Sequence, residues 1–262
     1  MTTVRVGVQV QPQHATFDQM REAWLEADEL GVDTIFTWDH FYPLYGEPDG
    51  QHFECLTSLA VMAQITKRAQ VGALVTCNSY RNPELLADAH RTIDHISGGR
   101  AIMGIGAGWF ERDYDEYGYE FGVAPDRLRA LSRDLPRIEA RLAKLNPGPV
   151  GKLPILIGGS GPKVTLKLVA KHAAMWHSFG DVEAYNAKAE ILAGHCAAVG
   201  RDPSEIEHTW GVMNNLMDQV DDLRAAGVSH FILGVGGAPG GYDLETLREL
   251  VAWRDRQNGT AS

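Results

Sequence analysis

The sequence predicts an α/β fold, a (β/α)8 barrel that comprises residues 1–262 as a single domain. Short apolar runs rich in β-prone residues alternate with helical patterns along the chain, in eight units. No internal repeat and no linker interrupts this alternation. A chain of 262 residues with 44% hydrophobic content can also bury one large core, which is ordinary for such a barrel.

Residues 71–108 show the repeating unit most clearly. The apolar run 71–75 is too short for a helix and is followed by polar residues, which is typical of a strand. Asn82-Pro83 then begins a helix, because proline at the first helical position loses no needed N–H. Ser97-Gly98-Gly99 ends this helix, and the run 101–105 predicts the next strand. A strand that follows a crossover helix is almost always parallel to the first.

The remaining elements follow in order. We expect the other strands at 4–10, 34–37, 154–157, 174–178, 206–212 and 230–235. Thr16 and Gln19 form a capping box for the first helix. Later helices are expected from about 54 to before 68, and at 125–145, 163–171 and 181–199. A further helix follows the strand at 206–212 and extends to 226, and the last is expected at 244–253. Pro136 predicts a kink or a break, because proline removes a backbone bond inside a helix.

Two segments are predicted to be loops. Residues 42–53 are rich in aromatic residues, glycine and proline and are too long for a tight connection. They form either a lid or an unstructured insertion. Residues 110–119 are expected to be a polar aromatic loop.

Composition and charge exclude several classes of partner. A net charge of −10 argues against a broad surface for nucleic acid or for an anionic membrane. Three scattered cysteines form no disulfide framework, no apolar run reaches membrane length, and no signal peptide is recognised before Val4. We therefore expect a cytoplasmic protein that binds a small-molecule substrate.

In such a barrel, the C-terminal ends of the strands form the reactive face. Polar or glycine-rich groups follow six predicted strands, at Gln9 and Gln11, Asp39 and His40, 76–78, 106–109, 158–163 and 176–178. The same rim would receive the aromatic residues Trp38, Phe41, Tyr42, Tyr45, Trp109, Phe110 and Trp176. Core packing is expected for Trp38 and Phe41. Flat apolar rings suit a planar cofactor or a hydrophobic substrate, so Tyr42, Trp109 and Trp176 are pocket candidates, with His177 beside them.

The turn at 158–163 has the composition of a phosphate site. It consists of Gly158, Gly159, Ser160, Gly161, Pro162 and Lys163 and opens a helix. Its backbone N–H groups and the positive end of the helix dipole suit a phosphate, and Ser160 and Lys163 can add direct contacts. The alternative is that two glycines before a helix only make a tight turn. The barrel context favours phosphate.

Asp39-His40 has three interpretations. A histidine and a carboxylate at a strand end can be a general acid and base, a metal pair or a structural hydrogen bond. Their position at a strand end favours a functional role. A metal is not expected, because the first strand offers Gln9 and Gln11 where further histidine ligands would be needed.

The strand at 71–75, the motif YRNP, a helix, DHISGGR and GIGAGW together resemble the bacterial luciferase-like oxidoreductases. The resemblance is strongest to the branch that uses the deazaflavin coenzyme F420, and within it to a short mycobacterial-type group. It extends from the first strand to about Trp176. It implies a luciferase-like barrel, a homodimer, and F420 as cofactor, with FMN as the alternative.

The resemblance also implies roles for particular residues. His40 would lie next to the carbon that transfers hydride, and Asp39 would line the deazaflavin ring. The peptide bond between Ala73 and Leu74 would be cis in a bulge that presses on the ring, with Thr76 following on the same strand end. The turn at 158–163 would hold the cofactor's phosphate.

The sequence departs from the sugar-phosphate dehydrogenases of this family. Trp109 stands where those enzymes have a glutamate acid, and Leu44 stands where they have a tryptophan. No matching set of lysine and arginine residues is visible, so glucose 6-phosphate is not the expected substrate. The acids nearest to Trp109 are Glu111 and Asp113, which either replace the glutamate or face solvent.

The leading hypothesis is an F420-dependent oxidoreductase that transfers hydride between the deazaflavin and an unidentified small organic substrate. An FMN-dependent monooxygenase is the alternative within the enzyme class. A barrel that only binds the cofactor without catalysis is the alternative outside it. A metal-dependent hydrolase comes last.

Overall fold

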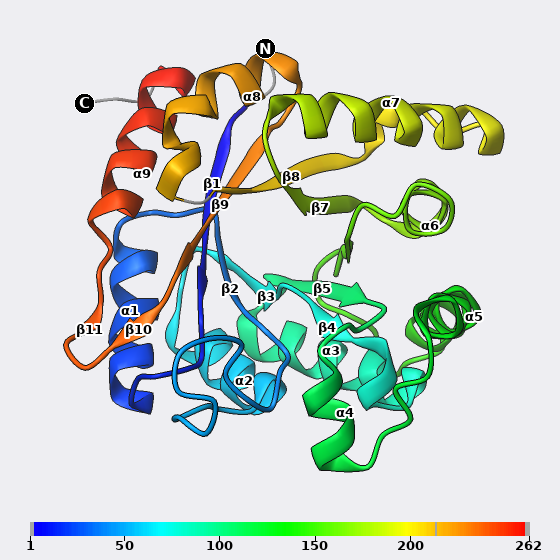
Figure 1. Ribbon diagram of the computed structural model, residues 1–262, viewed down its shortest axis with the longest axis horizontal. Coiled ribbons are helices and arrows are strands. Elements are labelled where there is room, and N and C mark those ends of the chain that lie inside the picture. Colours follow the sequence, from blue (N-terminus) through cyan, green and yellow to red (C-terminus); the bar gives the residue numbers. More distant parts are fainter. Residues whose placement is uncertain (1–2, 213, 260–262) are drawn as a thin grey trace.

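The structure is a computed structural model that describes residues 3–212 and 214–259. Its strands form a closed parallel barrel in the order β3-β2-β1-β9-β8-β7-β6-β5-β4, and pairing of β3 with β5 closes the ring (Figure 1). β3 and β4 share one position, so the barrel has eight strand positions within the described residues. The predicted (β/α)8 fold is confirmed.

The barrel strands are β1 (Arg5–Val10), β2 (Thr34–Thr37), β3 (Gln70–Ala73), β4 (Thr76–Cys77), β5 (Ala101–Gly106), β6 (Ile155–Gly158), β7 (Met175–Phe179), β8 (Glu207–Val212) and β9 (His230–Val235). The helices are α1 (Phe17–Glu29), α2 (Cys55–Ile65), α3 (Pro83–Ser97), α4 (Glu111–Tyr117), α5 (Ala124–Leu142), α6 (Thr165–His172), α7 (Val182–Val199), α8 (Val220–Ala226) and α9 (Glu245–Asn258). Short 3-10 helices lie at Asn78–Tyr80, Pro203–Glu205 and Asn214–Gln219, and β10 (Gly237–Ala238) pairs with β11 (Gly241–Tyr242).

Local sequence signals placed most helix ends correctly. Thr16 and Gln19 form the predicted capping box of α1. The Asn82 side chain accepts from Leu85 N–H at the start of α3, with Pro83 in the first turn. These signals act within one helical turn, which is why sequence alone is sufficient to find them.

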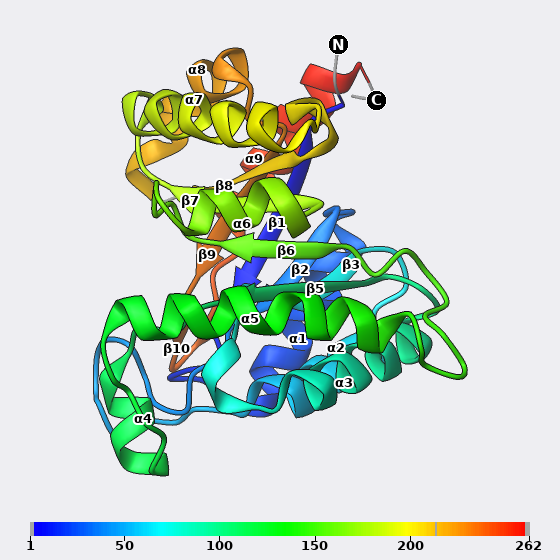
Figure 2. The same cartoon turned by 90° about the vertical axis from the view of Figure 1, so that its right-hand side faces the viewer.

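Two local predictions were wrong. The segment expected as a loop at 110–119 contains helix α4, whose acidic first turn suits the positive end of the helix and whose Asp113 and Tyr114 are buried. Helix α5 also continues through Pro136, so the chain has no break there, and a kink at this proline stays a prediction. α5 runs beside α3 (Figure 2), where Arg137 pairs with Glu84 at 2.8 Å, so packing on α3 supports the helix around the proline.

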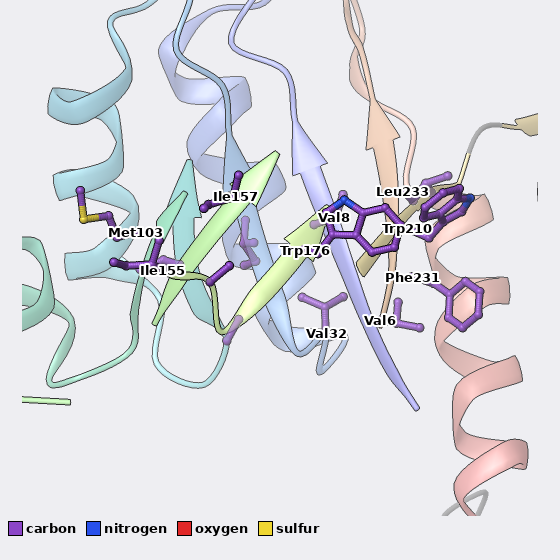
Figure 3. Packing of buried hydrophobic residues seen from close by; sticks show 14 of the residues in the cluster. Val6, Val8, Val32, Met103, Ile155, Ile157, Trp176, Trp210, Phe231 and Leu233 are labelled. Carbon is purple, nitrogen blue, oxygen red and sulfur yellow. The ribbon is translucent and has the colours of Figure 1, made fainter. Parts of the chain in front are cut away.

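Alternation along each strand divides the barrel into an inner and an outer layer. The inner layer is a separate apolar cluster made of Phe36, Leu74, Ile102, Leu156, Met175 and Ile232. The outer layer belongs to the main core between barrel and helices, where Figure 3 shows Trp176 and Trp210 together with Val6 and Val8.

Polar side chains close the N-terminal end of the barrel interior. Arg5 Nη1 donates to Glu207 at 2.9 Å, and Arg5 Nη2 donates to Gln70 Oε1 at 2.5 Å. Thr34 Oγ1 and His230 Nε2 are hydrogen-bonded at 2.8 Å. These groups satisfy one another's hydrogen bonds and close this end of the barrel, so their role is structural. Functional residues of such barrels lie at the C-terminal end.

Within the described residues, no helix is both long and apolar enough to cross a membrane. The expectations of a homodimer and of a cytoplasmic location stay predictions.

Replacing Gly104 with alanine should destabilise the barrel. A Cβ at this inward-facing position of β5 would lie 1.9 Å from the Ala73 carbonyl oxygen, so backbone must move. We expect the free energy of unfolding to fall by about 1–3 kcal/mol in urea titrations. Gly194→Ala in α7 is the control, since its Cβ would meet nothing within 4 Å and should cost nothing. Equal stability of the two variants would contradict the barrel packing described above.

Stability should also decrease as the pH is lowered, because of His90 in α3. This side chain is fully buried, and burial lowers its pKa to about 4, whereas the unfolded chain has a pKa of about 6.5. Only the unfolded state therefore takes up the proton as pH falls from 6.5 towards 4, and stability present above pH 6.5 is lost in that window. The loss from His90 should be about 2 kcal/mol between pH 7 and pH 5. Urea titrations of His90→Leu should show a correspondingly smaller loss over this range, and an unchanged loss would refute the assignment.

Candidate functional site at the mouth of the barrel

Glycines surround the C-terminal mouth of the barrel. By alternation from the inner apolar layer, Gly106, Gly158, Gly211 and Gly234 face inward at the ends of β5, β6, β8 and β9. Cβ atoms at Gly106 and Gly158 would lie 2.8 and 3.0 Å from methyl groups of Val75, so this side chain packs directly on their backbones. The mouth therefore has an apolar floor at Val75 and backbone walls, a surface that suits the close approach of a flat ligand.

Two hydrogen-bond acceptors lie near this mouth. Gln11 Oε1 is buried and has no hydrogen-bond partner among the described residues. His177 bonds through Nδ1 to Thr209 Oγ1 at 2.9 Å, and Thr209 Oγ1 itself donates to the Trp176 carbonyl at 3.1 Å. His177 Nδ1 must therefore carry the hydrogen, which leaves Nε2 as an acceptor. Burial, with a smaller effect of His230, lowers the pKa of His177 to about 3, so the ring is neutral at pH 7.

His40 lies at the rim just after β2 and is held by Asp113 of α4. His40 Nδ1 is 2.7 Å from Asp113 Oδ2, and the His40 side chain is 12% exposed. Asp113 also accepts from the backbone N–H groups of Phe41 and Tyr42, at 3.0 and 3.2 Å, and from the Tyr80 hydroxyl at 2.9 Å. Burial raises the pKa of Asp113, but the hydrogen bonds from His40 and Phe41 outweigh it, and the pKa lies below its usual range. Of the two acids considered from the sequence, Glu111 is exposed and Asp113 is the one in the site.

Aromatic rings enclose the His40 imidazole. Trp109 and Phe110 meet it edge-on, with ring centroids at 5.7 and 5.6 Å, and Trp38 does the same at 5.8 Å. Trp109 is 62% exposed, so its ring forms part of the open rim. The structure thus brings Trp109 to the rim, as the sequence predicted, and sets its ring against His40. Tyr42 lies close by, under the Arg112 guanidinium at 4.0 Å.

The loop 42–53 is an ordered wall of this rim. Leu44 N–H donates to Gln13 Oε1 at 2.8 Å, His14 N–H donates to the Gln51 carbonyl at 2.9 Å, and Phe53 N–H donates to the Pro12 carbonyl at 3.1 Å. Trp38 Nε1 donates to His52 Nε2 at 3.0 Å. These bonds rule out an unstructured insertion.

Asp39 does not reach the mouth. Its side chain is 1% exposed and accepts from Arg81 at 2.6 and 2.9 Å and from Cys77 N–H at 2.9 Å. Arg81, the arginine of the YRNP motif, also pairs with Glu54 at the start of α2. The expected contact between the Asp39 side chain and a cofactor ring is therefore corrected: the carboxylate is enclosed by Arg81 and the Cys77 N–H, and it ties the end of β2 to the segment after β4.

Trp176 also lies elsewhere than expected. It is fully buried on the outer face of β7, where its ring packs against Trp210 at 5.6 Å and Tyr185 at 6.3 Å (Figure 3). Because successive side chains point to opposite faces, Trp176 faces the helices and His177 faces the interior. The same alternation brings Phe179, which is 69% exposed, to the rim, and the sequence analysis missed this residue.

The cis peptide bond lies one residue later than expected, between Leu74 and Val75. The Leu74 N–H still donates to the Thr37 carbonyl at 2.8 Å, so pairing with β2 extends through Ala73 and Leu74 and the chain departs only after them. Ala73 is buried, and the Thr76 hydroxyl donates to the Gly104 carbonyl. This bulge presents Val75 to the mouth, whereas Ala73 and Thr76 are turned to the protein and Leu74 belongs to the inner apolar layer on which Val75 packs.

In the turn at 158–163, Gly159 cannot offer its N–H to a phosphate. This N–H donates to the His177 carbonyl at 2.9 Å, and the Gly159 carbonyl accepts from Trp176 Nε1 at 2.9 Å. The N-terminus of α6 lies further on, at Thr165, and a Cβ at Gly161 would lie 2.8 Å from Thr165 Oγ1. Ser160, Gly161, Lys163 and Thr165 remain as the groups of this turn that could hold an anion, and Thr165 is not among those that the sequence singled out.

Some residues of the mouth carried a signal that the sequence analysis did not use. Gly211 and Gly234 each stand two residues after an inward-facing residue at the end of a strand. Period-two counting along β8 and β9 could have found them.

Within the described part of the chain, histidine, cysteine and acidic side chains form no group of three or more that could hold a metal ion.

Comparison with known proteins identifies the family of this chain. A family model described as luciferase-like monooxygenase matches residues 1–258. The chain belongs to this family. Relatives in sequence include an F420-dependent glucose-6-phosphate dehydrogenase of Amycolatopsis mediterranei, 28% identical over 65% of this chain and 54% of that enzyme. An uncharacterised Mycobacterium tuberculosis protein is 27% identical over 67% of this chain and 73% of its own length.

Among solved structures, an F420-dependent secondary alcohol dehydrogenase in complex with an F420-acetone adduct superposes with a TM-score of 0.79. It is 16% identical and covers 90% of this chain and 94% of its own. At that identity, the likeness shows the family's fold. The chain spans about half the length of the Amycolatopsis relative. The chain is thus a member of the luciferase-like family and has that family's barrel.

Removing the Asp39 carboxylate should mainly lower the free energy of unfolding. Asp39→Ala leaves the Arg81 guanidinium, whose side chain is 14% exposed, without its bidentate partner. Breaking such a buried pair typically costs about 3–5 kcal/mol, and because Glu54 still pairs with Arg81 we expect the lower end of this range in urea unfolding. Asp126→Ala is the control, because its pair with Arg129 is exposed and should contribute less than about 1 kcal/mol. A stable Asp39→Ala protein that only loses ligand affinity would restore the original interpretation.

Proposed function

We propose that this protein is an F420-dependent oxidoreductase that transfers hydride between the deazaflavin and a small organic substrate. The observation that carries the proposal is the His40 imidazole, whose Nδ1 is bound to a buried carboxylate while Nε2 has no partner among the described residues. A buried carboxylate behind one ring nitrogen, with the second nitrogen free, is the arrangement of a histidine that acts as a general acid or base.

The residues at the mouth fit a deazaflavin. Val75 and the backbones of Gly211 and Gly234 offer an apolar, closely approachable surface for a planar ring. Gln11 Oε1 and His177 Nε2 can accept from N–H groups at the edge of such a ring. Ser160, Lys163 and Thr165 at the start of α6 can hold the phosphate. When bound, the deazaflavin supplies or accepts the hydride.

The chain's own part in the reaction is to move a proton and to keep water out. His40 Nε2 would take the hydroxyl proton when an alcohol is oxidised, or return a proton to oxygen when a carbonyl is reduced. Trp109 and Phe110 would shield this atom from bulk water, because their rings border the imidazole. The F420-dependent relatives support this cofactor over FMN, which remains the alternative that the experiment must separate.

Binding of F420 and of FMN should be compared by fluorescence titration of the purified protein. We expect quenching of F420 fluorescence and a dissociation constant at least tenfold lower for F420 than for FMN. Tighter binding of FMN would replace the proposal with the FMN-dependent monooxygenase. Binding of F420 with no turnover across a broad panel of alcohols, ketones, imines and alkenes would favour the cofactor-binding barrel.

His40→Gln should separate chemistry from binding. We expect F420 affinity within about tenfold of the wild type and turnover reduced by about 10²–10⁴, the usual worth of general acid–base catalysis. His95→Gln, at an exposed histidine near the end of α3, should leave both values unchanged. Wild-type turnover in His40→Gln would make His40 a packing residue.

A further inference from the structure

We propose that Asp113 is the positioning residue of this site: it holds the hydrogen of His40 on Nδ1 and thereby presents Nε2 as the atom that exchanges the proton. The inference rests on the proposed function for its kinetic consequence. Its structural content, the tautomer and orientation of His40, stands independently of any cofactor.

Asp113 can only accept hydrogen bonds from its neighbours. Oδ1 receives the N–H groups of Phe41 and Tyr42, at 3.0 and 3.2 Å. Oδ2 receives the Tyr80 hydroxyl at 2.9 Å and lies 2.7 Å from His40 Nδ1. A carboxylate with donors on both oxygens is ionised and has no hydrogen to give. His40 Nδ1 must therefore carry the hydrogen, and in the neutral ring the lone pair is on Nε2.

No other polar group competes for His40. The adjacent carboxylate of Asp39 is occupied by Arg81 and by the Cys77 N–H. Trp38, Trp109 and Phe110 touch the imidazole with ring edges. Among the described residues, Asp113 is thus the hydrogen-bond partner that sets which nitrogen of His40 is protonated.

Asp113 also fixes the backbone that carries the ring. Its two amide donors, Phe41 and Tyr42, are the residues directly after His40, so one carboxylate grips both the side chain and the chain that follows it. The side chain of Asp113 is fully buried, and its helix α4 begins two residues earlier at Glu111. A rigid element with an enclosed carboxylate restricts rotation of the imidazole, as preorganised sites require.

An asparagine at 113 would keep the shape and change the chemistry. Its amide nitrogen, if turned to His40, donates and so favours a hydrogen on Nε2. In a Ser-His-Asp triad, the same substitution preserves geometry and lowers kcat by about 10⁴ through the wrong tautomer. Asp113→Asn is therefore the decisive variant, and Asp113→Ala is avoided because it also frees the loop amides.

The first test needs no cofactor. In protein labelled with ¹⁵N at histidine, two-bond ¹H–¹⁵N spectra distinguish a ring protonated at Nδ1 from one protonated at Nε2, and loss of one ring's signals in His40→Gln assigns His40. We expect Nδ1–H in the wild type and Nε2–H, or a mixture, in Asp113→Asn. Nε2–H in the wild type, or an unchanged His40 pattern in Asp113→Asn, overturns the proposal.

The second test uses turnover with F420. Asp113→Asn should lower kcat at least a hundredfold while its F420 dissociation constant stays within threefold of the wild type. Asp115→Asn, an exposed acid on the same helix, is the matched control and should change neither value. A fall in F420 affinity as large as the fall in kcat would show that Asp113 shapes the cofactor site, and the proposal would fail. If the protein binds no F420, the proposed function fails and the histidine spectra still decide the role of Asp113.

Discussion

Strict alternation of side chains in a closed parallel barrel is the constraint on which the site depends. Each strand residue faces either the helices or the interior, and a neighbour in sequence faces the opposite way. Trp176 thus enters the outer core, whereas His177 enters the mouth. The same alternation turns glycine backbones toward the interior at the C-terminal end. At the other end it turns Arg5 and Glu207 inward, where their ion pair closes the barrel.

Two buried carboxylates hold the rim around His40, and each solves the same physical problem. An ionised carboxylate without water needs donors, and a barrel rim has unpaired backbone N–H groups and cationic side chains to offer. Asp39 takes the Cys77 N–H and Arg81, which ties β2 to the segment after β4. Asp113 takes two N–H groups, a tyrosine hydroxyl and His40. The first carboxylate joins β2 to the segment after β4, and the second holds the His40 ring.

The surroundings of His40 combine one protic group with an otherwise aromatic wall. The rings of Trp38, Trp109 and Phe110 border the imidazole and offer it no competing carboxylate. Rings of this kind would help to exclude water from the hydride transfer that we propose. Arg112 directly precedes Asp113 in the sequence. Its guanidinium lies over the Tyr42 ring and donates to the Pro48 carbonyl in the loop 42–53. The site that we propose thus combines an uncharged wall beside His40 with a proposed anion site at the start of α6.

The sequence by itself determined the barrel, most helix ends and the rim positions of His40 and Trp109, because these follow from periodicity and from signals within one turn of the chain; the catalytic role of His40 stays a prediction. Only the tertiary structure decided what His40 bonds to, since Asp113 is 73 residues away and its helix α4 exists through burial on the rim. It also decided that Asp39 faces Arg81 and that the Gly159 N–H is already used by His177. Local patterns show which groups can form a hydrogen bond, and the competition among distant partners for each donor is settled only when the barrel closes.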